Sequence, residues 1–193
     1  GEISTTSFFP AKPLGCYGDG GAIFTDDEGL AGIIRSIRVH GSGSDKYENV
    51  RIGLNGRLDT FQAAILLEKL AIFDDELQLR NKVSDYYMEN INSSLQKPTI
   101  PAQYFSSWAQ YSLLADSEAE RTKIMERLNK LSIPSMIYYR IPLHIQSVFR
   151  DLGYSIGDFK SSENISSQIF SIPMHPYLDR NQQDIVIEVL NNG

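Results

Sequence analysis

Apolar residues recur at three- and four-residue spacing in two stretches of the first hundred positions. The first stretch follows Asp26 and Asp27, either of which can cap a helix. The second runs from Leu58 to Ile91, and no Gly or Pro falls between residues 57 and 97. This pattern predicts a helix from about residue 26, followed later by one long helix or two abutting helices.

The first 25 residues show no helical period and are rich in Gly, Pro, Ser and Thr, a composition typical of loops. Residues 20–25, Gly-Gly-Ala-Ile-Phe-Thr, end this stretch and predict a short buried strand. A single strand followed by one helix cannot form a sheet. We therefore expect residues 1–40 to need strands from elsewhere, and the chain to be the carboxy-terminal part of a longer protein.

Two prolines, Pro98 and Pro101, interrupt the chain after the long helical stretch. Beyond them, strand-like and helix-like segments alternate, which is typical of a small α+β unit. We therefore predict two domains, 1–97 and 98–193. Within the second, strands are expected at 109–115 and 134–139, and helices at 117–131, 145–152, 162–168 and 179–190.

The composition excludes several classes of protein. Hydrophobic residues make up 41% and charged residues 22% of the 193 positions, as in an ordinary globular protein. The formal charge of −6 has the wrong sign for binding a polyphosphate backbone, so no nucleic-acid partner is expected. One cysteine and three scattered histidines provide neither an internal disulfide nor a cysteine-based zinc site, and we expect no metal.

The chain shows no membrane-directing signal. It contains no apolar run of about 18 residues, the length that would suggest a spanning helix. Its first residues also lack the basic and then apolar pattern of a signal peptide. We therefore expect no membrane partner and a cytoplasmic location.

Lys12 lies in an unusual setting, between Pro10 and Pro13 and close to Phe8 and Phe9. An ammonium group in an apolar pocket loses solvation, and the resulting free amine is a nucleophile toward carbonyl groups. This setting suits Schiff-base chemistry. The alternative is a loop lysine whose stem lies on a phenylalanine while its head stays in water.

Hydroxyl and glycine residues surround Lys12. Residues 4–7 carry four hydroxyls, including that of Ser7, and glycines follow at 15, 18, 20 and 21. Both residue types suit a phosphate, although the spacing matches no nucleotide-binding motif and a tight turn before a strand would look the same. Near residue 58, Asn55 and Arg57 could contact an anion at a helix N-terminus, or Asn55 or Asp59 could simply cap that helix.

A third group of candidates follows the predicted strand 134–139. Tyr139, Arg140 and His144 belong to a strand-end loop, a usual place for ligand contacts. Tyrosines and a histidine packed at a domain edge would give the same pattern. His175, between Met174 and Pro176, is interpreted as a structural histidine.

Taken in order, these segments resemble the DegT/DnrJ/EryC1/StrS family of sugar aminotransferases, which use pyridoxal 5′-phosphate (PLP). The resemblance is collinear from residue 4 to residue 190 and covers nearly the whole chain. It implies the α/β fold of type I aminotransferases. The segment 1–97 would then hold the end of the large PLP-binding domain and a long connecting helix, and 98–193 the small α+β domain. The matching segments are 7–15, 18–25, 52–65, 137–144 and 171–176.

The resemblance also implies roles for individual residues. The lysine at the position of Lys12 forms a Schiff base with PLP and later carries a proton. Ser7 binds the cofactor phosphate, and Asn55 reaches that phosphate across the interface of a homodimer with shared active sites. Arg57 lies near the nucleotide-sugar, Tyr139 lines the sugar pocket, and His144 is a further substrate-binding candidate.

The amine donor implied by the resemblance is L-glutamate, and the acceptor is a keto-sugar nucleotide. Residues 8–21 are most similar to the branch that aminates C3 of UDP-2-acetamido-3-oxo-glucuronate for surface-polysaccharide synthesis. Pro13 and Arg140 depart from the residues common in the family, which affects substrate contacts more than the reaction.

The family places several cofactor contacts upstream of the lysine, in an amino-terminal half that these 193 residues do not include. We therefore expect this chain to be a fragment of a protein about twice as long, with little or no activity alone. Two alternatives remain. PLP-dependent sugar dehydratases replace the lysine by histidine, so Lys12 argues against them. A non-catalytic regulatory or binding protein is disfavoured by the retention of Ser7, Lys12 and Asn55 together.

Overall fold

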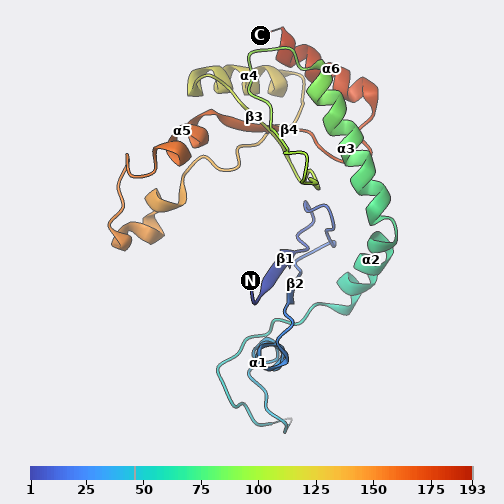
Figure 1. Ribbon diagram of the computed structural model, residues 1–193, viewed down its shortest axis with the longest axis vertical. Helices are drawn as coiled ribbons and strands as arrows, with labels where there is room; N and C mark the ends of the chain where they lie inside the picture. Colours follow the sequence, from blue (N-terminus) through green and yellow to red (C-terminus); the bar gives the residue numbers. More distant parts are fainter. Residues whose placement is uncertain (46, 193) are drawn as a thin grey trace. The chain divides into compact units, whose positions relative to one another are not determined.

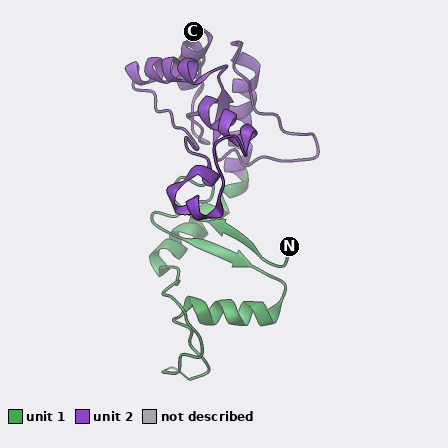
Figure 2. Cartoon of the chain, turned by 90° about the vertical axis from the view of Figure 1, so that its left-hand side faces the viewer, with its two compact units in different colours: residues 1–74 green, residues 75–193 purple. Residues whose placement is uncertain are grey.

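The computed structural model describes residues 1–45 and 47–192. The chain divides into two compact units, Gly1–Asp74 (unit 1) and Asp75–Gly193 (unit 2), shown in Figure 2. This division falls within the long helical stretch. The domains 1–97 and 98–193 stay a prediction about the whole protein.

Unit 1 contains two short paired strands (Figure 1). Strand β1 (Ser4–Ser7) runs antiparallel to β2 (Gly21–Phe24), with Ser4 opposite Phe24 and Ser7 opposite Gly21. The prediction of a loop over residues 4–7 is therefore wrong. The run Ser-Thr-Thr-Ser has no alternation of apolar and polar positions, so only its pairing with β2 reveals it as a strand. The strand over residues 20–25 is confirmed, but Ile23 and Phe24 are more than half exposed within this chain rather than buried.

The helices of unit 1 begin at acidic caps. Helix α1 (Glu28–Arg38) begins after Asp27, whose side chain accepts the N–H of Leu30 at 2.9 Å. Helix α2 (Thr60–Ala71) begins after Asp59, which accepts the N–H of Phe61 at 2.8 Å. Because a cap side chain satisfies a free N–H of the first turn, both helices start where the sequence predicts.

The long helical stretch consists of two abutting helices. Helix α3 (Phe73–Asn90) follows α2 after Ile72, whose φ of −111° and ψ of 4° break the helix. Helix α3 ends at Asn90, one residue before Ile91, the last apolar position of the predicted helical pattern. The side chain of Asn90 donates to the carbonyl of Tyr86, and the N–H of Asn92 binds the side chain of Asn191. These asparagine side chains bind backbone groups that would otherwise bond to a further helical turn, and the helix ends here.

Unit 2 is built on a second antiparallel pair, β3 (Tyr111–Leu114) and β4 (Ile169–Ile172), with Tyr111 opposite Ile172. These strands confirm the predicted segment 109–115 and show that residues 169–172 extend as a strand. The predicted strand 134–139 is wrong, because only Met136 pairs there, through an isolated bridge to Ser171. Pro134 has no N–H to contribute to a ladder, which shortens the pairing at this edge.

Helices cover the pair β3 and β4 and enclose the core of unit 2. Helices α4 (Glu118–Lys130) and α6 (Arg180–Asn191) match the predicted helices within one or two residues and begin at the caps Ser117 and Asp179. The most deeply buried side chains belong to α3, the two strands and these two helices. They are Tyr87, Tyr111, Leu113, Leu128, Phe170 and Leu190.

The segment between α4 and β4 contains short elements. Two 3₁₀ helices, η1 (Leu143–Ile145) and η2 (Ser147–Leu152), occupy the place of the predicted helix 145–152. Gly153 ends η2 with a φ of 79°, which few other residues adopt at low cost. Helix α5 (Lys160–Gln168) then leads into β4.

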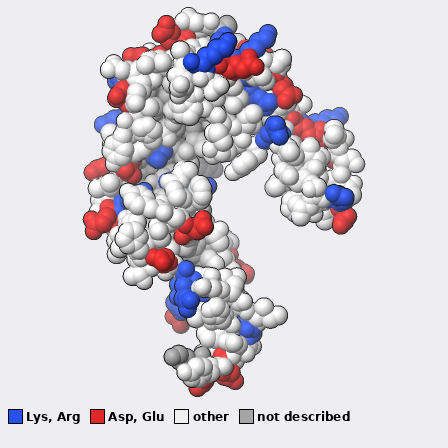
Figure 3. All heavy atoms as spheres, turned by 180° about the vertical axis from the view of Figure 1, so that it is seen from behind, with Lys and Arg blue, Asp and Glu red and all other residues white. Residues whose placement is uncertain are grey.

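The surface carries both signs of charge. Figure 3 shows one face, on which basic and acidic side chains are interspersed among neutral residues. No helix in the described part of the chain is long and apolar enough to cross a membrane.

Candidate functional site

Lys12 lies at the tip of a closed loop between β1 and β2. The loop is closed by backbone hydrogen bonds from Phe8 N to Gly20 O and from Cys16 N to Phe8 O, both 2.8 Å. The buried thiol of Cys16 donates to the carbonyls of Phe8 and Gly18, at 3.0 and 3.1 Å. Gly15 packs so closely on the turn that a Cβ would lie 2.7 Å from the carbonyl of Phe9. These contacts give the loop one conformation.

The side chain of Lys12 is exposed on this loop. Its backbone N–H donates to the carbonyl of Phe9 at 2.8 Å, and Nζ has no hydrogen bond or ion pair with the described residues. Phe9 is itself 52% exposed, so unit 1 does not supply the apolar enclosure that the sequence suggested. The amine therefore projects from the closed loop without a partner among the described residues.

Ser7 ends β1, five residues before Lys12, and its hydroxyl accepts the N–H of Phe9 at 3.2 Å. The side of the hairpin toward α1 contains a cavity of about 790 Å³. Thr5, Thr6 and Arg57 line this cavity, whereas Ser7, Lys12 and Asn55 do not. The hydroxyls predicted to bind phosphate are thus divided between the cavity and the lysine loop.

Helix α2 braces the lysine loop. The side chain of Gln62 accepts the N–H of Tyr17 at 2.7 Å. Lys69 donates from Nζ to the carbonyl of Gly15 at 2.6 Å, and Nζ lies 4.8 Å from the centre of the Tyr17 ring. Lys69 therefore has a structural role, and Lys12 is the amine that the loop leaves free.

Asn55 and Arg57 lie on a segment that returns beside α1. An isolated bridge pairs Asn55 with Val39, and the N–H of Gly56 donates to the carbonyl of Arg38 at 2.8 Å. Both candidate side chains are exposed. Asp59 caps α2, which confirms the capping alternative for Asp59 and leaves Asn55 outside the cap. The amide of Asn55 is left available for a ligand or a partner.

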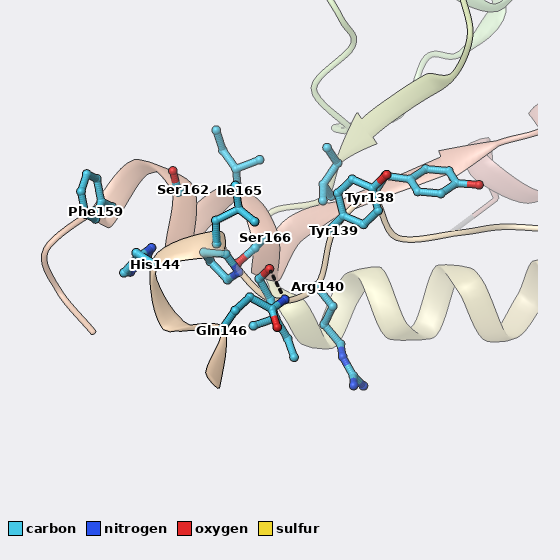
Figure 4. Close-up of a pocket in the computed structure, with 13 residues that line it drawn as sticks. Tyr138, Tyr139, Arg140, His144, Gln146, Phe159, Ser162, Ile165 and Ser166 are labelled. Carbon is cyan, nitrogen blue, oxygen red and sulfur yellow. Dashed lines mark hydrogen bonds between the residues drawn. The ribbon is translucent and has the colours of Figure 1, made fainter. Parts of the chain in front are cut away.

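Tyr139 and His144 belong to unit 2 and line a second cavity, of about 860 Å³ (Figure 4). Tyr139 is 73% exposed, and its ring lies 5.5 Å from that of Tyr138. Figure 4 shows the two tyrosines on one side of the cavity and His144 with Phe159 on the other, while the guanidinium of Arg140 points away from them. The lining combines aromatic and aliphatic surface with a few polar groups, as ligand pockets commonly do.

His144 is held by a residue that sequence reasoning missed. Its Nε2 lies 3.0 Å from a carboxylate oxygen of Glu163, and only 8% of its side chain is exposed. The ring also lies 4.8 Å from that of Phe159. Glu163 lies 19 residues further along the chain, so the only sequence signal was an acidic residue in the first turn of a predicted helix.

The comparison with protein families identifies the family of the chain. The sequence model of the DegT/DnrJ/EryC1/StrS aminotransferase family matches residues 1–191. The chain belongs to this family. Its members are PLP-dependent sugar aminotransferases, which confirms the resemblance seen in the sequence.

Individual relatives support the assignment. A UDP-2-acetamido-2-deoxy-3-oxo-D-glucuronate aminotransferase of Pseudomonas aeruginosa is 42% identical over 98% of this chain and 51% of its own length. A protein of Geobacillus stearothermophilus described as a pleiotropic regulatory protein is 38% identical, over 97% of this chain and 50% of its own. The chain therefore spans about half the length of the curated relatives it matches.

A solved structure shows the same fold. A DegT DnrJ EryC1 StrS aminotransferase from Brucella abortus superimposes with a TM-score of 0.92 at 47% identity. The match covers all of this chain and 51% of that one. The predicted aminotransferase fold is thereby confirmed for this part of the family's architecture.

The residues of unit 1 fit the chemical requirements of the family's cofactor. PLP needs an amine for its carbonyl carbon and polar donors for its phosphate. Unit 1 offers an unpaired primary amine at Lys12, a hydroxyl at Ser7 and a carboxamide at Asn55, all exposed. Among the described residues, no three His, Cys, Asp or Glu side chains form a group that could hold a metal ion.

Proposed function

We propose that the longer protein containing this chain is a PLP-dependent aminotransferase. It transfers an amino group from L-glutamate to the C3 ketone of a UDP-2-acetamido-3-oxo-hexuronate, in the synthesis of a surface-polysaccharide sugar. The main support is the family match over residues 1–191 together with the free amine of Lys12 on an ordered loop. The 42% identity to the Pseudomonas enzyme supports this choice of sugar.

Ser7, Lys12 and Asn55 are the cofactor-binding residues in this proposal. Lys12 binds the cofactor's carbonyl carbon through Nζ, and the hydroxyl of Ser7 binds its phosphate. The amide of Asn55 binds the phosphate of the second subunit's cofactor, so the active enzyme is a homodimer with shared sites. Loop closure by Cys16 holds Lys12 in place before the cofactor arrives, which lowers the entropy cost of binding.

Lys12 also moves the proton. When bound, PLP supplies an electron-withdrawing ring that makes the α-proton of an amino acid acidic. Lys12 Nζ, freed when the incoming amine takes its place, would remove the proton from the α-carbon of glutamate and return it on the other side of the amine nitrogen, at the cofactor's carbonyl carbon. The same atom carries out the reverse transfer with the keto-sugar. One lysine thus serves as covalent anchor and as general acid and base.

Arg57, Tyr139 and His144 are the substrate-binding residues in this proposal. The guanidinium of Arg57 pairs with its phosphates, because a planar fork of donors matches phosphate oxygens. Tyr139 and His144 line the pocket for the sugar. The half of the relatives' length that this chain does not span would supply the remaining cofactor contacts, so this chain alone should transaminate little or not at all.

The test measures the covalent adduct of the full-length protein. After addition of PLP and then borohydride, intact mass should show one reduced adduct per subunit, located on Lys12. Lys12→Ala should retain the fold and lose both the adduct and transamination. Lys123→Ala, which changes an exposed lysine on α4, should retain both. Absence of an adduct in the unmodified full-length protein would contradict the proposal.

A second candidate function is a regulatory or binding role without catalysis. The relative described as a pleiotropic regulatory protein, at 38% identity, is the observation in its favour. A full-length protein that binds a sugar nucleotide but forms no Lys12 adduct would support this role.

A further inference from the structure

The carboxylate of Glu163 binds three residues of unit 2. Its carboxylate accepts the N–H of Gly157 at 2.9 Å to both oxygens and the N–H of Phe159 at 3.2 Å. It also pairs with Nε2 of His144 at 3.0 Å. Only 17% of the Glu163 side chain is exposed. A partly buried carboxylate with this many donors orients every group that it binds.

The pairing determines which nitrogen of His144 remains for a ligand. The donors around Glu163, with the hydrogen bond from Gly157 contributing most, lower the pKa of its carboxyl, so that it is an ionised acceptor. Since an ionised carboxylate only accepts, Nε2 of His144 must carry the hydrogen. Nδ1 forms no hydrogen bond with the described residues and is the ring nitrogen left for another partner.

Glu163 lies behind the wall of the 860 Å³ cavity rather than in it. His144, Phe159 and Ser162 line the cavity, whereas Glu163 does not. The wall depends on Glu163 at two points, because the carboxylate binds the backbone of Phe159 and the ring of His144. The rings of His144 and Phe159 also contact each other, at 4.8 Å. A change in Glu163 would therefore alter the cavity without removing any group that lines it.

We propose that Glu163 is a positioning residue for the sugar-nucleotide site, acting by holding His144 in the orientation that presents Nδ1 to the ligand. This inference rests on the proposed function of the cavity. Glu163 also stabilises the start of α5, where Phe159 provides no side-chain cap. The two roles are separable, because a neutral amide at this position keeps one acceptor oxygen for the backbone N–H groups but has no second acceptor oxygen for Nε2 of His144.

The separating variant is Glu163→Gln in the full-length protein. Its amide oxygen still accepts from the backbone of Gly157 or Phe159, but the charge that holds His144 is lost. The dissociation constant for UDP-N-acetylglucosamine, measured by titration calorimetry, should rise about tenfold, as for loss of one charge-assisted hydrogen bond. The thermal unfolding midpoint at pH 7 should fall only modestly, because the amide still accepts a backbone N–H although the stability from the ionised carboxylate is lost. In a His144→Ala background, Glu163→Gln should weaken binding no further, because its effect passes through His144.

Asp179→Ala is the matched control, because it removes the capping box of α6 but touches no residue of the cavity. It should lower the unfolding midpoint and leave the dissociation constant unchanged. Unchanged binding by Glu163→Gln, or an equal loss in both backgrounds, would overturn the positioning role while leaving the proposed function intact. Failure of the unmodified protein both to bind this nucleotide and to transaminate would instead refute the proposed function, and this inference with it.

Discussion

At the scale of single residues, the groups available for chemistry are those that neighbouring residues leave without a hydrogen-bond partner. Lys12 and Lys69 are both lysines of unit 1 near the same loop, yet Lys69 is bound to the carbonyl of Gly15 and Lys12 has no such partner. His144 and Glu163 show the reverse case, in which two groups far apart in sequence satisfy each other. Which side chain is available to react therefore depends on its hydrogen-bond partners as well as on its residue type.

Glu163 makes the stability of the chain depend on pH. Its pKa is lowered from the ordinary value of 4.5, first by the hydrogen bond from Gly157 and further by Phe159 and His144. The stability from its ionised form is present above the unfolded pKa and is lost as the pH falls through the lower, folded pKa. In Glu163→Gln, the free energy of unfolding should therefore fall less between about pH 6 and pH 3. Urea unfolding at several pH values checks this, and parallel curves for the two proteins would contradict it.

At the scale of elements, two glycines set the position of the segment that carries Asn55. Gly41 and Gly53 pack backbone against backbone, and a Cβ on Gly53 would lie 2.0 Å from the nitrogen of Gly41 and 2.7 Å from the carbonyl of Ile37. No side-chain movement relieves contacts made with the backbone. This crossing holds residues 54–57 beside the end of α1.

Gly53→Ala should consequently destabilise the full-length protein by about 3 kcal/mol or more, because the backbone must shift to admit the methyl group. If Asn55 binds phosphate, the affinity for PLP should fall as well. Gly32→Ala on α1 is the control, since a Cβ there meets nothing within 4 Å. That change should be neutral or stabilise by about 0.5–1 kcal/mol. Denaturant unfolding and PLP titration measure both effects, and equal behaviour of the two variants would refute this account.

At the scale of the whole molecule, burial is distributed unequally. Every residue of the principal core cluster belongs to unit 2. In unit 1, the buried hydrophobic residues are Cys16 and Leu66, while Ile23, Phe24 and Phe61 are more than half exposed. Ordering a backbone costs about 1 kcal/mol or more per residue, which so little burial does not offset. Unit 1 therefore depends on apolar contacts that its own residues do not provide.

Residues 75–193 should accordingly fold alone, and residues 1–74 should not. Circular dichroism should show a cooperative thermal transition for the first segment and none for the second. Addition of the family's amino-terminal half, expressed with residues 1–74, should restore a transition if that half covers the exposed surface. A cooperative transition of isolated residues 1–74 would contradict this interpretation.

Much of the fold was predictable because local signals were strong. Asp27, Asp59, Ser117 and Asp179 cap helices where the pattern predicts them. Strands were harder: residues 4–7 carry no apolar alternation, and residues 134–139 read as a strand but form a single bridge. Strand pairing is a contact between distant segments, so a local pattern cannot establish it.

The candidate residues were proposed from the sequence, but their surroundings were not. Lys12 drew attention through its prolines and phenylalanines, yet the apolar enclosure suggested by those neighbours is not present in unit 1. Glu163 was not proposed as a site residue, because it pairs with His144, which lies 19 residues earlier in the sequence.

The sequence alone determined the family and the helix starts and proposed Lys12 as the reactive amine, because each depends on residue types at short, fixed spacing. Only the tertiary structure decided that Cys16 closes the lysine loop, that Gly41 and Gly53 hold the Asn55 segment and that Glu163 orients His144. These are contacts between segments that meet only after the chain has folded, and their energy depends on distance and burial rather than on order along the chain.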